Sequence, residues 1–421
     1  MPAAEPPGSD FSLSEITRLF EPVAGEASLA LAVSGGSDST ALMHLAHRWG
    51  ATRDSPPRLT VLTVDHGLRA ESAAEAATVA RWAKELGLRH ATLQWTGAKP
   101  WTGLQALARE ARYRLMTGWC AEHGVKTLIL AHTIDDQAET VLMRLKRGAG
   151  VEGLGGMEPV SERDGVVLFR PLLGERRERL RDLLRSIRRS WIDDPSNEDE
   201  KFERIGMRRA LAEAGIAAES LALTARRARR AFDAILDASR TFLEASVIHH
   251  EEGYGEIARD RWLAAPAEIK LRAVSSLVSR YGDRSFTPLS QLEMLAEWLD
   301  FGEGRARTLG GCRIERSKSS VRFGREPGRI DPSPVPVSER LKWDGRFDIV
   351  VHGRSTGLAV IPAGVARDLK RRPALPAFVQ AGLPAILLDG ELAAVPHLGL
   401  RTEAAPPHLM VTAVFDARPW F

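Results

Sequence analysis

The sequence predicts an α/β protein that begins with a doubly wound parallel sheet and continues into an α-helical domain and a small C-terminal α/β domain. Three observations lead to this prediction. Over roughly the first two hundred residues, short apolar runs alternate with stretches of helical periodicity, as in a parallel sheet covered by helices. From about Leu211 to Phe301 the chain is rich in Ala, Leu and Arg and has almost no strand pattern. A Pro-dense segment, Pro327–Pro336, then separates this stretch from the C-terminal residues.

The parallel sheet is predicted from apolar runs and from the amphipathic stretches between them. Strands are expected at Ser28–Val33, Leu59–Val64, His90–Gln94, Thr127–Leu130 and Val166–Leu172. Helices with apolar residues at i, i+3, i+4 and i+7 are expected at Ser39–Trp49, Ser72–Leu86, Gly103–His123 and Ile134–Lys146. A basic helix over Arg176–Arg188 should follow, ended by the polar turn at Ile192–Asn197.

Three domains are expected, with boundaries at residues 1–215, 216–326 and 337–421. The segment Pro327–Pro336 is predicted to be a linker, because it is poor in large apolar residues. Beyond it, short apolar runs alternate with turns. They predict strands at Phe347–Val351, Leu358–Ile361, Ala385–Leu388 and Leu409–Phe415.

The composition narrows the class of protein. Hydrophobic residues make up 44% of the 421 residues and charged residues 27%, which is usual for globular proteins and excludes the disordered and fibrous classes. Cys120 and Cys312 are the only cysteines and lie far apart, which argues against a disulfide framework or a zinc site and suits a reducing cytoplasm. Residues 1–9 lack a secretion signal, and no apolar run is long enough to suggest a membrane span.

The positive charge is concentrated in two stretches, although the formal net charge is only +3. Arg170 to Arg189 contains eight Arg against three acidic residues, and Arg204 to Arg230 contains seven Arg against two. Such stretches indicate a polyanionic partner, because Lys and Arg that neutralise phosphates release condensed counterions. Two solvated amphipathic helix faces would give the same pattern. Charge alone leaves both interpretations open.

The string Ser34-Gly35-Gly36-Ser37-Asp38-Ser39 directly follows an apolar strand and precedes a helix. Backbone N–H groups at such a helix start form an anion site that suits a phosphate. The glycines allow a tight turn, and the serine hydroxyls add donors. A carboxylate beside phosphates implies a bridging Mg²⁺, so Asp38 is the predicted metal ligand. The competing interpretation is an ordinary Gly-Ser turn with a Ser or Asp N-cap.

A second acidic string follows the fourth predicted strand. On a helix that begins near Ile134, Asp135 and Asp136 lie in the first turn, and Asp136 and Glu139 share one face. Two carboxylates on one face can hold a metal or receive an ammonium group. First-turn acids also often cap helices, and this alternative applies more to Asp135 than to the other two. His132, just before the helix, is either a ligand or proton-handling residue or a core histidine.

These strings recur in the order typical of a known family. The loop lacks the Lys of the Walker type and resembles the SGGxDS loop of the PP-loop ATP pyrophosphatases, which have an adenine nucleotide alpha hydrolase-like fold. The further strings are VDHGLR from Val64, ARYR from Ala111, AHxxDDQAET from Ala131, RGxGxxGLxGM from Arg147, RPLL from Arg170 and the DDPSN turn from Asp193. Together they resemble the tRNA(Ile)-lysidine synthases over roughly residues 25–210.

The resemblance implies an activity, cofactors and partners. Members use ATP and Mg²⁺ to adenylate the 2-carbonyl oxygen of the wobble cytidine in a tRNA(Ile) with a CAU anticodon, and free lysine then displaces AMP. Carried over by position, Ser34 to Ser39 bind ATP and Asp38 binds Mg²⁺. Arg112 then neutralises phosphate, while Asp136 or Glu139, with His132 nearby, receives the ammonium of lysine. Arg147 and Arg170 are candidates to face tRNA or pyrophosphate.

Two positions depart from the family pattern. Thr133 stands where a second His is common, which questions a proton path through that position, and Arg204-Ile205 stands where an Arg-Asn pair is common. Neither change touches the phosphate loop. Two other functions compete with this interpretation: a tRNA thiolase, disfavoured by the missing catalytic cysteines, and a non-catalytic RNA-binding protein, disfavoured by the intact motifs. The sequence does not fix the oligomeric state, for which a homodimer is considered, or how methionine tRNAs are rejected.

Overall fold

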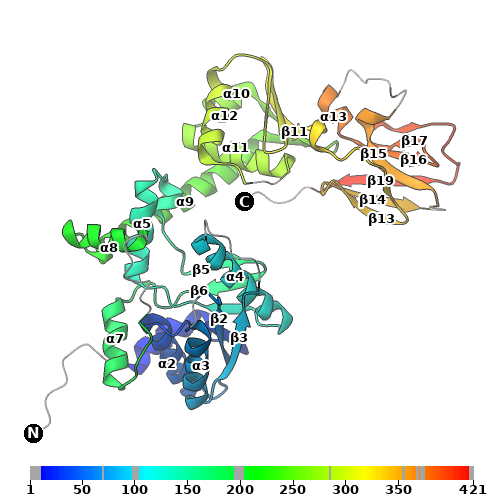
Figure 1. The fold of residues 1–421 in the computed structure, drawn as a ribbon. Helices are drawn as coiled ribbons and strands as arrows, with labels where there is room; N and C mark the ends of the chain where they lie inside the picture. The colour runs from blue at the N-terminus through cyan, green and yellow to red at the C-terminus, as the bar shows by residue number, and fades with distance from the viewer. Residues whose placement is uncertain are drawn as a thin grey trace, which may run out of the picture. The chain divides into compact units, whose positions relative to one another are not determined.

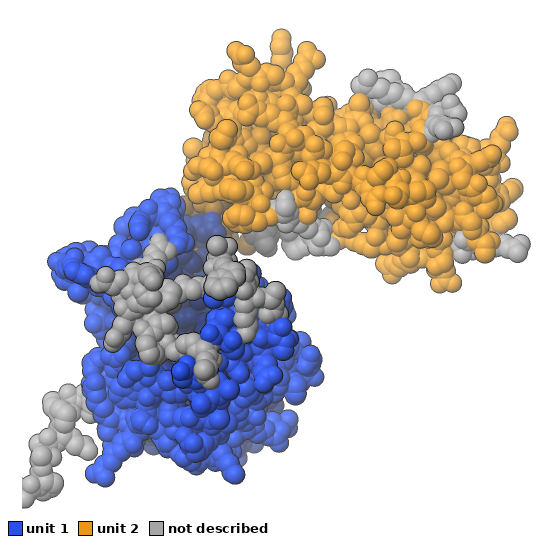
Figure 2. Space-filling view, in the orientation of Figure 1, with its two compact units in different colours: residues 1–232 blue, residues 233–421 orange. Residues whose placement is uncertain are grey.

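The structure is a computed structural model that describes residues 11–68, 71–96, 104–193, 203–283, 286–352, 356–366, 369 and 375–416. The chain forms two compact units, residues 1–232 and 233–421, which Figure 2 draws in different colours. Their boundary falls inside the long helix α9 (Ala218–Ser246). The predicted division into three domains, with boundaries at 215 and 326, stays a prediction.

The first unit is built on a mostly parallel sheet (Figure 1). Its strand order is β3-β2-β1-β4-β6-β5, and β5 alone pairs antiparallel. The strands are β1 (Ser28–Ala32), β2 (Arg58–Asp65), β3 (Arg89–Gln94), β4 (Thr127–Ile129), β5 (Val160–Arg163) and β6 (Val166–Phe169). All five predicted strands are present, although the last ends earlier than expected. The strand β5 was missed, despite the Asp164-Gly165 turn that joins it to β6 with positive φ at both residues.

Helices cover both faces of this sheet, which confirms the doubly wound prediction. One face carries α1 (Leu13–Phe20), α2 (Ser37–Ala51), α3 (Ser72–Glu85) and α7 (Arg177–Ser186), which share one hydrophobic core. The other face carries α4 (Leu104–Glu122) over a second core. Successive side chains of β1 point to opposite faces of the sheet, so Leu29 and Leu31 enter the first core while Ala30 enters the second.

The order of the strands places two loops side by side. Strand β1 pairs in parallel with β2 on one side and with β4 on the other, so the chain reverses its direction of winding between β1 and β4. In open α/β sheets, ligands bind beyond the carboxyl ends of the strands at such a switch point. The loop after β1 and the loop after β4 therefore start from adjacent positions at this edge.

The remaining helices of the first unit pack beside the switch point. They are α5 (Ile134–Lys146), α6 (Val151–Leu154), α8 (Glu203–Glu213) and the first part of α9. A small apolar cluster joins α5, α8 and α9 and is formed by Ile134, Ala138, Leu211, Ala218 and Ala222. This cluster fixes the position of α5, the helix that carries the acidic string. Most of the turn predicted at 192–197 lies outside the described residues.

The second unit begins with helices packed on an antiparallel sheet. The helices are α10 (Arg259–Ala264), α11 (Ala267–Tyr281) and α12 (Leu289–Phe301). The sheet contains β7 (Val247–His250), β8 (Tyr254–Ala258), β9 (Ala306–Leu309), β10 (Cys312–Arg316) and β11 (Ser320–Arg325). The expectation of a purely helical stretch over 211–301 was wrong at β7 and β8. These two strands form a hairpin whose turn contains Gly253 at a φ of 82°, a conformation that suits glycine.

The C-terminal part of the second unit is rich in strands. It contains a five-stranded sheet in the order β12-β15-β16-β17-β18 and a three-stranded sheet in the order β13-β14-β19. The four predicted strands correspond to β14 (Phe347–His352), β15 (Leu358–Pro362), β16 (Pro384–Leu388) and β19 (Met410–Phe415). The others are β12 (Val335–Pro336), β13 (Arg340–Trp343), β17 (Glu391–Val395) and β18 (Leu400–Arg401), and α13 (Ala377–Ala381) is a short helix.

The predicted linker Pro327–Pro336 is packed into this part of the unit. Ile330 is buried within its hydrophobic core, and β12 pairs with β15 through Val335 and Pro336. The Pro-dense composition concealed one buried apolar residue and one pairing segment, so the interpretation as a free linker was wrong. Within the described part of the chain, no helix is long and apolar enough to cross a membrane.

Candidate active site at the carboxyl edge of the sheet

The glycine-serine loop lies between β1 and α2 and is fixed by its own side chains. Helix α2 begins at Ser37, two residues earlier than predicted, and Gly36 is its N-cap residue without a side-chain cap. The Ser39 hydroxyl donates to the Gly36 carbonyl (3.1 Å) and accepts from the Ser34 amide (3.2 Å). The Thr40 hydroxyl donates to the Gly35 carbonyl (3.0 Å). The first amides of α2 donate to no group of the described residues and can receive a ligand, as in a phosphate-binding loop.

Gly35 is the position in this loop where a side chain does not fit. Its φ is 92°, and an added Cβ would lie 2.6 Å from Ile192 Cδ1 and 3.2 Å from Val79 Cγ2. The Ile192 amide also donates to the Gly35 carbonyl (2.9 Å). The segment after α7 therefore packs directly on the loop, a contact that the sequence did not indicate.

The acidic string at the start of α5 is ordered by capping contacts. Thr133 is the N-cap residue, and its hydroxyl and amide both donate to Asp136 Oδ2 (2.8 and 2.9 Å). The Asp136 amide donates in return to the Thr133 hydroxyl (3.3 Å), which completes a capping box. Thr133, which departs from the family pattern, therefore positions one of the predicted catalytic carboxylates.

Asp135 caps a different helix. Its Oδ2 accepts from the backbone amide of Arg177 (2.8 Å), the first residue of α7, and its Oδ1 lies 3.4 Å from Arg176. This geometry favours the capping interpretation for Asp135. It also attaches the start of α7 to the start of α5.

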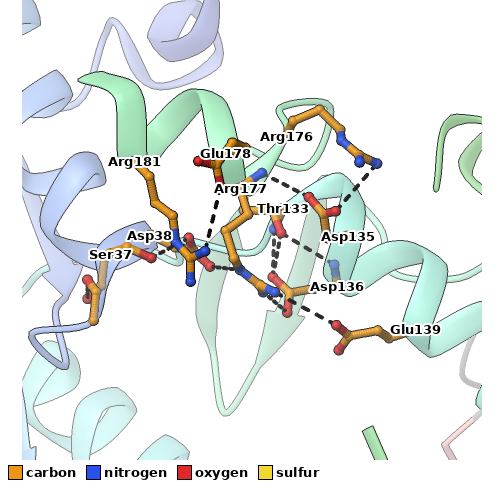
Figure 3. Close-up of polar contacts among 12 residues, drawn as sticks. Ser37, Asp38, Thr133, Asp135, Asp136, Glu139, Arg176, Arg177, Glu178 and Arg181 are labelled. Carbon is orange, nitrogen blue, oxygen red and sulfur yellow. Dashed lines mark hydrogen bonds and ion pairs between the residues drawn. The ribbon is translucent and has the colours of Figure 1, made fainter. Parts of the chain in front are cut away.

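Arg177 is the residue that brings the two strings together (Figure 3). Its Nε donates to Asp38 Oδ2 (2.8 Å) and its Nη2 donates to Asp136 Oδ1 (2.9 Å), while its Nη1 lies 3.8 Å from Glu139 Oε1. Only 17% of the Arg177 side chain is exposed. Sequence reasoning counted Arg177 only as one charge of a basic stretch and missed its position. The structure thus brings Asp38, Asp136 and Glu139 together around one guanidinium.

Glu139 has a second basic partner. Arg208 of α8 forms a short hydrogen bond from its Nε to Glu139 Oε1. The other oxygen, Oε2, is buried and accepts no hydrogen bond from any described residue. The Glu139 side chain is 1% exposed, so this oxygen is an unsatisfied acceptor inside the site.

Burial and charge shift the pKa values of these groups in different directions. Desolvation raises the pKa of Asp38 and of Glu139 in spite of their arginine partners. Desolvation acts on Asp136 in the same sense, but Arg177 and the Thr133 donors outweigh it, so the pKa of Asp136 is lowered. Desolvation disfavours the charged form of Arg177, but the surrounding carboxylates more than offset it and raise its pKa. Arg177 is therefore a permanent cation in this site.

His132 is a buried titratable group close to Asp136. Burial lowers the pKa of His132 to about 3, and the neighbouring Arg170, Arg112 and Arg109 act in the same sense. His132 Nδ1 makes no hydrogen bond to any described residue. Arg109 and Arg112 lie over the ring of Tyr113, at 5.2 and 5.6 Å. His132 is therefore neutral at pH 7 and is a weak base.

Arg170 has a structural position. It is buried, and its Nη1 donates to the Glu158 carbonyl (2.8 Å) and to the Ser161 hydroxyl (3.0 Å). These contacts join the end of β6 to the segment that enters β5. The expectation that Arg170 faces a tRNA or pyrophosphate does not fit this burial.

The residues around Asp38 suit one kind of metal site. Among the described residues, no group of three or more His, Cys, Asp or Glu side chains is arranged to hold a metal. Mg²⁺, however, is often bound by one or two carboxylates together with substrate phosphates. Asp38 lies in the first turn of α2 beside the free amides, and its Oδ1 accepts from the Ser37 hydroxyl (3.1 Å). The donor set fits a Mg²⁺ that arrives with a nucleotide, and the role of Asp38 as its ligand stays a prediction.

The two basic stretches differ in how their charges are used. In the first, most arginines pair with acidic side chains of the same unit. These pairs are Arg176–Asp135, Arg177–Asp38, Arg179–Glu15, Arg181–Glu178, Arg185–Asp182 and Arg189–Glu85. In the second, Arg226, Arg227 and Arg230 of α9 are exposed and form no ion pair with a described residue. The second stretch therefore offers a group of unpaired charges to a polyanion.

Comparisons with known proteins give one consistent result. Residues 10–214 match a family model described as a PP-loop domain. A relative from Bradyrhizobium sp. (strain BTAi1 / ATCC BAA-1182), named tRNA(Ile)-lysidine synthase, is 43% identical over 77% of this chain and 95% of its own. Relatives of the same name from Ruegeria pomeroyi and Rhodopseudomonas palustris are 42% and 46% identical, over 88% and 77% of this chain and 89% and 95% of their own.

The loop contact predicts different effects for its two glycines. Gly35→Ala should lower the free energy of unfolding of the first unit by about 1–3 kcal/mol, because alanine is strained at a φ of 92° and its Cβ meets Ile192. Gly36→Ala is the matched control. Its φ is −65° and the nearest atom to an added Cβ is 3.8 Å away, so the loss should stay below about 1 kcal/mol. Urea unfolding measures the free energy of unfolding of both variants. Equal losses would contradict the conclusion that a side chain does not fit at Gly35.

Buried His44 of α2 predicts a pH dependence of stability. Burial and the nearby Arg189 and His47 lower the pKa of His44 from 6.5 to about 4 in the folded protein. Below pH 6.5 the unfolded chain therefore binds a proton that the folded chain does not, so stability should fall as the pH falls from 6.5 towards 4. The expected contribution is about 1 kcal/mol per pH unit between pH 6 and 5. In His44→Gln, the free energy of unfolding measured with urea should change less steeply with pH, by that amount. An unchanged pH dependence would disprove the role of His44.

Proposed function

The chain belongs to the tRNA(Ile)-lysidine synthase family of ATP-using ligases, and on this premise we propose that it attaches free lysine to the wobble cytidine of a tRNA(Ile) with a CAU anticodon. One observation carries the proposal. The carboxylate of the phosphate-binding loop, Asp38, and the two carboxylates of α5, Asp136 and Glu139, converge on Arg177. The proposed nucleotide site and the proposed ammonium site are thus adjacent, which supports a two-step ligation.

The first step is adenylation of the cytidine. The 2-carbonyl oxygen attacks the α-phosphorus of ATP, the bond to the β-phosphate oxygen breaks, and pyrophosphate leaves. The amides of Ser37, Asp38 and Ser39 at the start of α2 are placed to receive phosphate oxygens. Asp38 would hold the Mg²⁺ that neutralises phosphate charge, and Arg112 is the further cation proposed for this purpose.

The second step joins lysine. Its ε-amine attacks C2 of the adenylated base, and AMP leaves with the oxygen that was adenylated. Asp136 and Glu139 are proposed to bind the side-chain ammonium, and the amine must lose a proton before it attacks. His132 lies near Asp136, but its lowered pKa makes it a weak base, so a carboxylate, Asp136 or Glu139, is the proposed acceptor for this proton. The cytoplasm, which holds tRNA and ATP, is the proposed compartment.

The thiolase alternative is weakened further by the positions of the cysteines. Cys120 is fully buried in α4, and burial raises the pKa of its thiol to about 11. Cys312 lies in the second unit, where burial also raises its pKa. A sulfur-transferring enzyme needs an accessible thiolate, and neither cysteine supplies one. We therefore propose nitrogen rather than sulfur as the incoming atom.

Asp38→Asn tests the phosphate assignment. The substitution removes the carboxylate charge proposed for Mg²⁺, so tRNA-dependent release of AMP and pyrophosphate should fall by at least about a hundredfold. Binding of the tRNA should change little, because Asp38 is not part of the exposed basic surface. Product release by thin-layer chromatography and tRNA binding by filter retention measure the two effects. Unchanged turnover would remove Asp38 from the mechanism.

The exposed arginines of α9 test the tRNA surface. Changing Arg226, Arg227 and Arg230 together to Gln should weaken tRNA binding and reduce its salt dependence, by about one unit of slope for each phosphate that is no longer neutralised. Arg185→Gln is the control, because Glu178 and Asp182 already neutralise Arg185. Filter binding at several salt concentrations measures both variants. If the triple variant binds like the control, this part of α9 is only a solvated surface.

One assay decides the overall proposal. The protein is incubated with ATP, radiolabelled lysine and a CAU-anticodon tRNA(Ile), and methionine tRNAs serve as controls. Incorporation of label into tRNA(Ile) alone supports the proposed function. Absence of incorporation, with ATP consumed, would reject lysine as the substrate.

A further inference from the structure

Arg177 occupies an unusual place for a basic residue. It is the first residue of α7, where the helix dipole disfavours a positive charge. Its backbone amide is held by Asp135, and its side chain turns toward Asp38 and Asp136. The local helix therefore does not explain a cation here, whereas the facing carboxylates do.

The contacts of Arg177 leave few acceptors for an incoming ammonium. Asp136 Oδ1 is bonded to Arg177 and its Oδ2 is bonded to Thr133. Glu139 Oε1 is bonded to Arg208, with Arg177 at 3.8 Å. Only Glu139 Oε2 is left without a hydrogen-bond donor among the described residues. Each carboxylate oxygen can accept a second hydrogen bond, but the guanidinium of Arg177 lies against both Asp136 and Glu139, so an ammonium held by both carboxylates competes with Arg177 for this position.

The charges of the cluster fit such an exchange. Three carboxylates, Asp38, Asp136 and Glu139, face two guanidinium groups, Arg177 and Arg208. The carboxylates outnumber the guanidinium groups by one, so the cluster can accept a further cation. Asp38 gives Arg177 a second carboxylate to which it remains bonded while it releases Asp136.

We propose that Arg177 is a specificity-determining residue that occupies the ammonium position and sets the affinity of the site for the amine substrate. The guanidinium leaves Asp136 when the ammonium enters. A cation that binds the carboxylates less well than Arg177 does therefore not displace it. The inference rests on the proposed function, because it takes lysine as the amine. Beyond the proposed function, it states that a side chain of the protein itself competes with lysine for the carboxylates.

Arg177→Ala tests the competition. In the labelled-lysine assay, the KM for lysine should fall about tenfold, because the ammonium no longer displaces a bonded guanidinium. The value of kcat is a separate quantity and does not decide the question. Arg181→Ala is the matched control, since Arg181 lies one turn further along α7 and pairs with Glu178 instead of with the carboxylates of the site. The control should leave the KM for lysine unchanged.

Free methylguanidinium provides a further test, and a purely structural role of Arg177 would not change its result. In Arg177→Ala it should fill the vacated space, compete with lysine and restore a high apparent KM. In the wild-type protein and in Arg181→Ala it should have no such effect at the same concentration. Absence of competition in a folded Arg177→Ala would overturn the proposal.

A second variant covers the case in which Arg177→Ala does not fold. In Arg177→Lys a cation remains in the site but lacks the planar fork with which Arg177 bonds both Asp38 and Asp136, so the KM for lysine should fall by a smaller factor, about threefold. An unchanged or higher KM in the folded variant, with thermal unfolding like that of the wild type, overturns the proposal. If the wild-type protein incorporates no lysine, the proposed function fails, and this result is distinct from a failure of the competition.

Discussion

The ion pairs of Arg177 connect the parts of the chain from which the candidate active site is built. Asp38 belongs to the loop after β1, Asp136 and Glu139 belong to the helix after β4, and Arg177 begins α7. The parallel pairing of β1 with β4 makes the first two segments neighbours. Without a cation between them, three partly buried carboxylates would repel one another in a medium of low dielectric constant. The arrangement of the loop, α5 and α7 therefore depends on this guanidinium.

The sequence was a good guide wherever the signal was contiguous. The glycine-serine loop, the strands of the first sheet and the helix that carries Asp136 and Glu139 each arise from local patterns, and the structure contains them. Convergence of the acidic groups at one edge could be expected, because parallel strands end there. Arg177 could not be identified in this way. It lies 139 residues from Asp38, and nothing distinguishes it locally from the other arginines of its stretch.

The errors in the second unit have a different origin. The hairpin β7–β8 was missed because His249, His250 and Glu256 give its strands a polar composition, and in β7 only Val247 is buried. The segment Pro327–Pro336 was taken as a linker because its average composition hides Ile330. Both cases show that burial of single residues, which depends on distant partners, is not visible in a window average.

The buried charges are better explained by the chemistry than by stability. Replacing a buried ion network by apolar side chains is often neutral or stabilising, so stability alone does not explain why this chain keeps one. An ionised carboxylate, however, is needed to bind an ammonium, and desolvation works against ionisation at this site. Arg177 opposes that effect most clearly at Asp136, whose pKa it helps to lower. The same guanidinium that prepares Asp136 to bind a cation is therefore the cation that a substrate must replace.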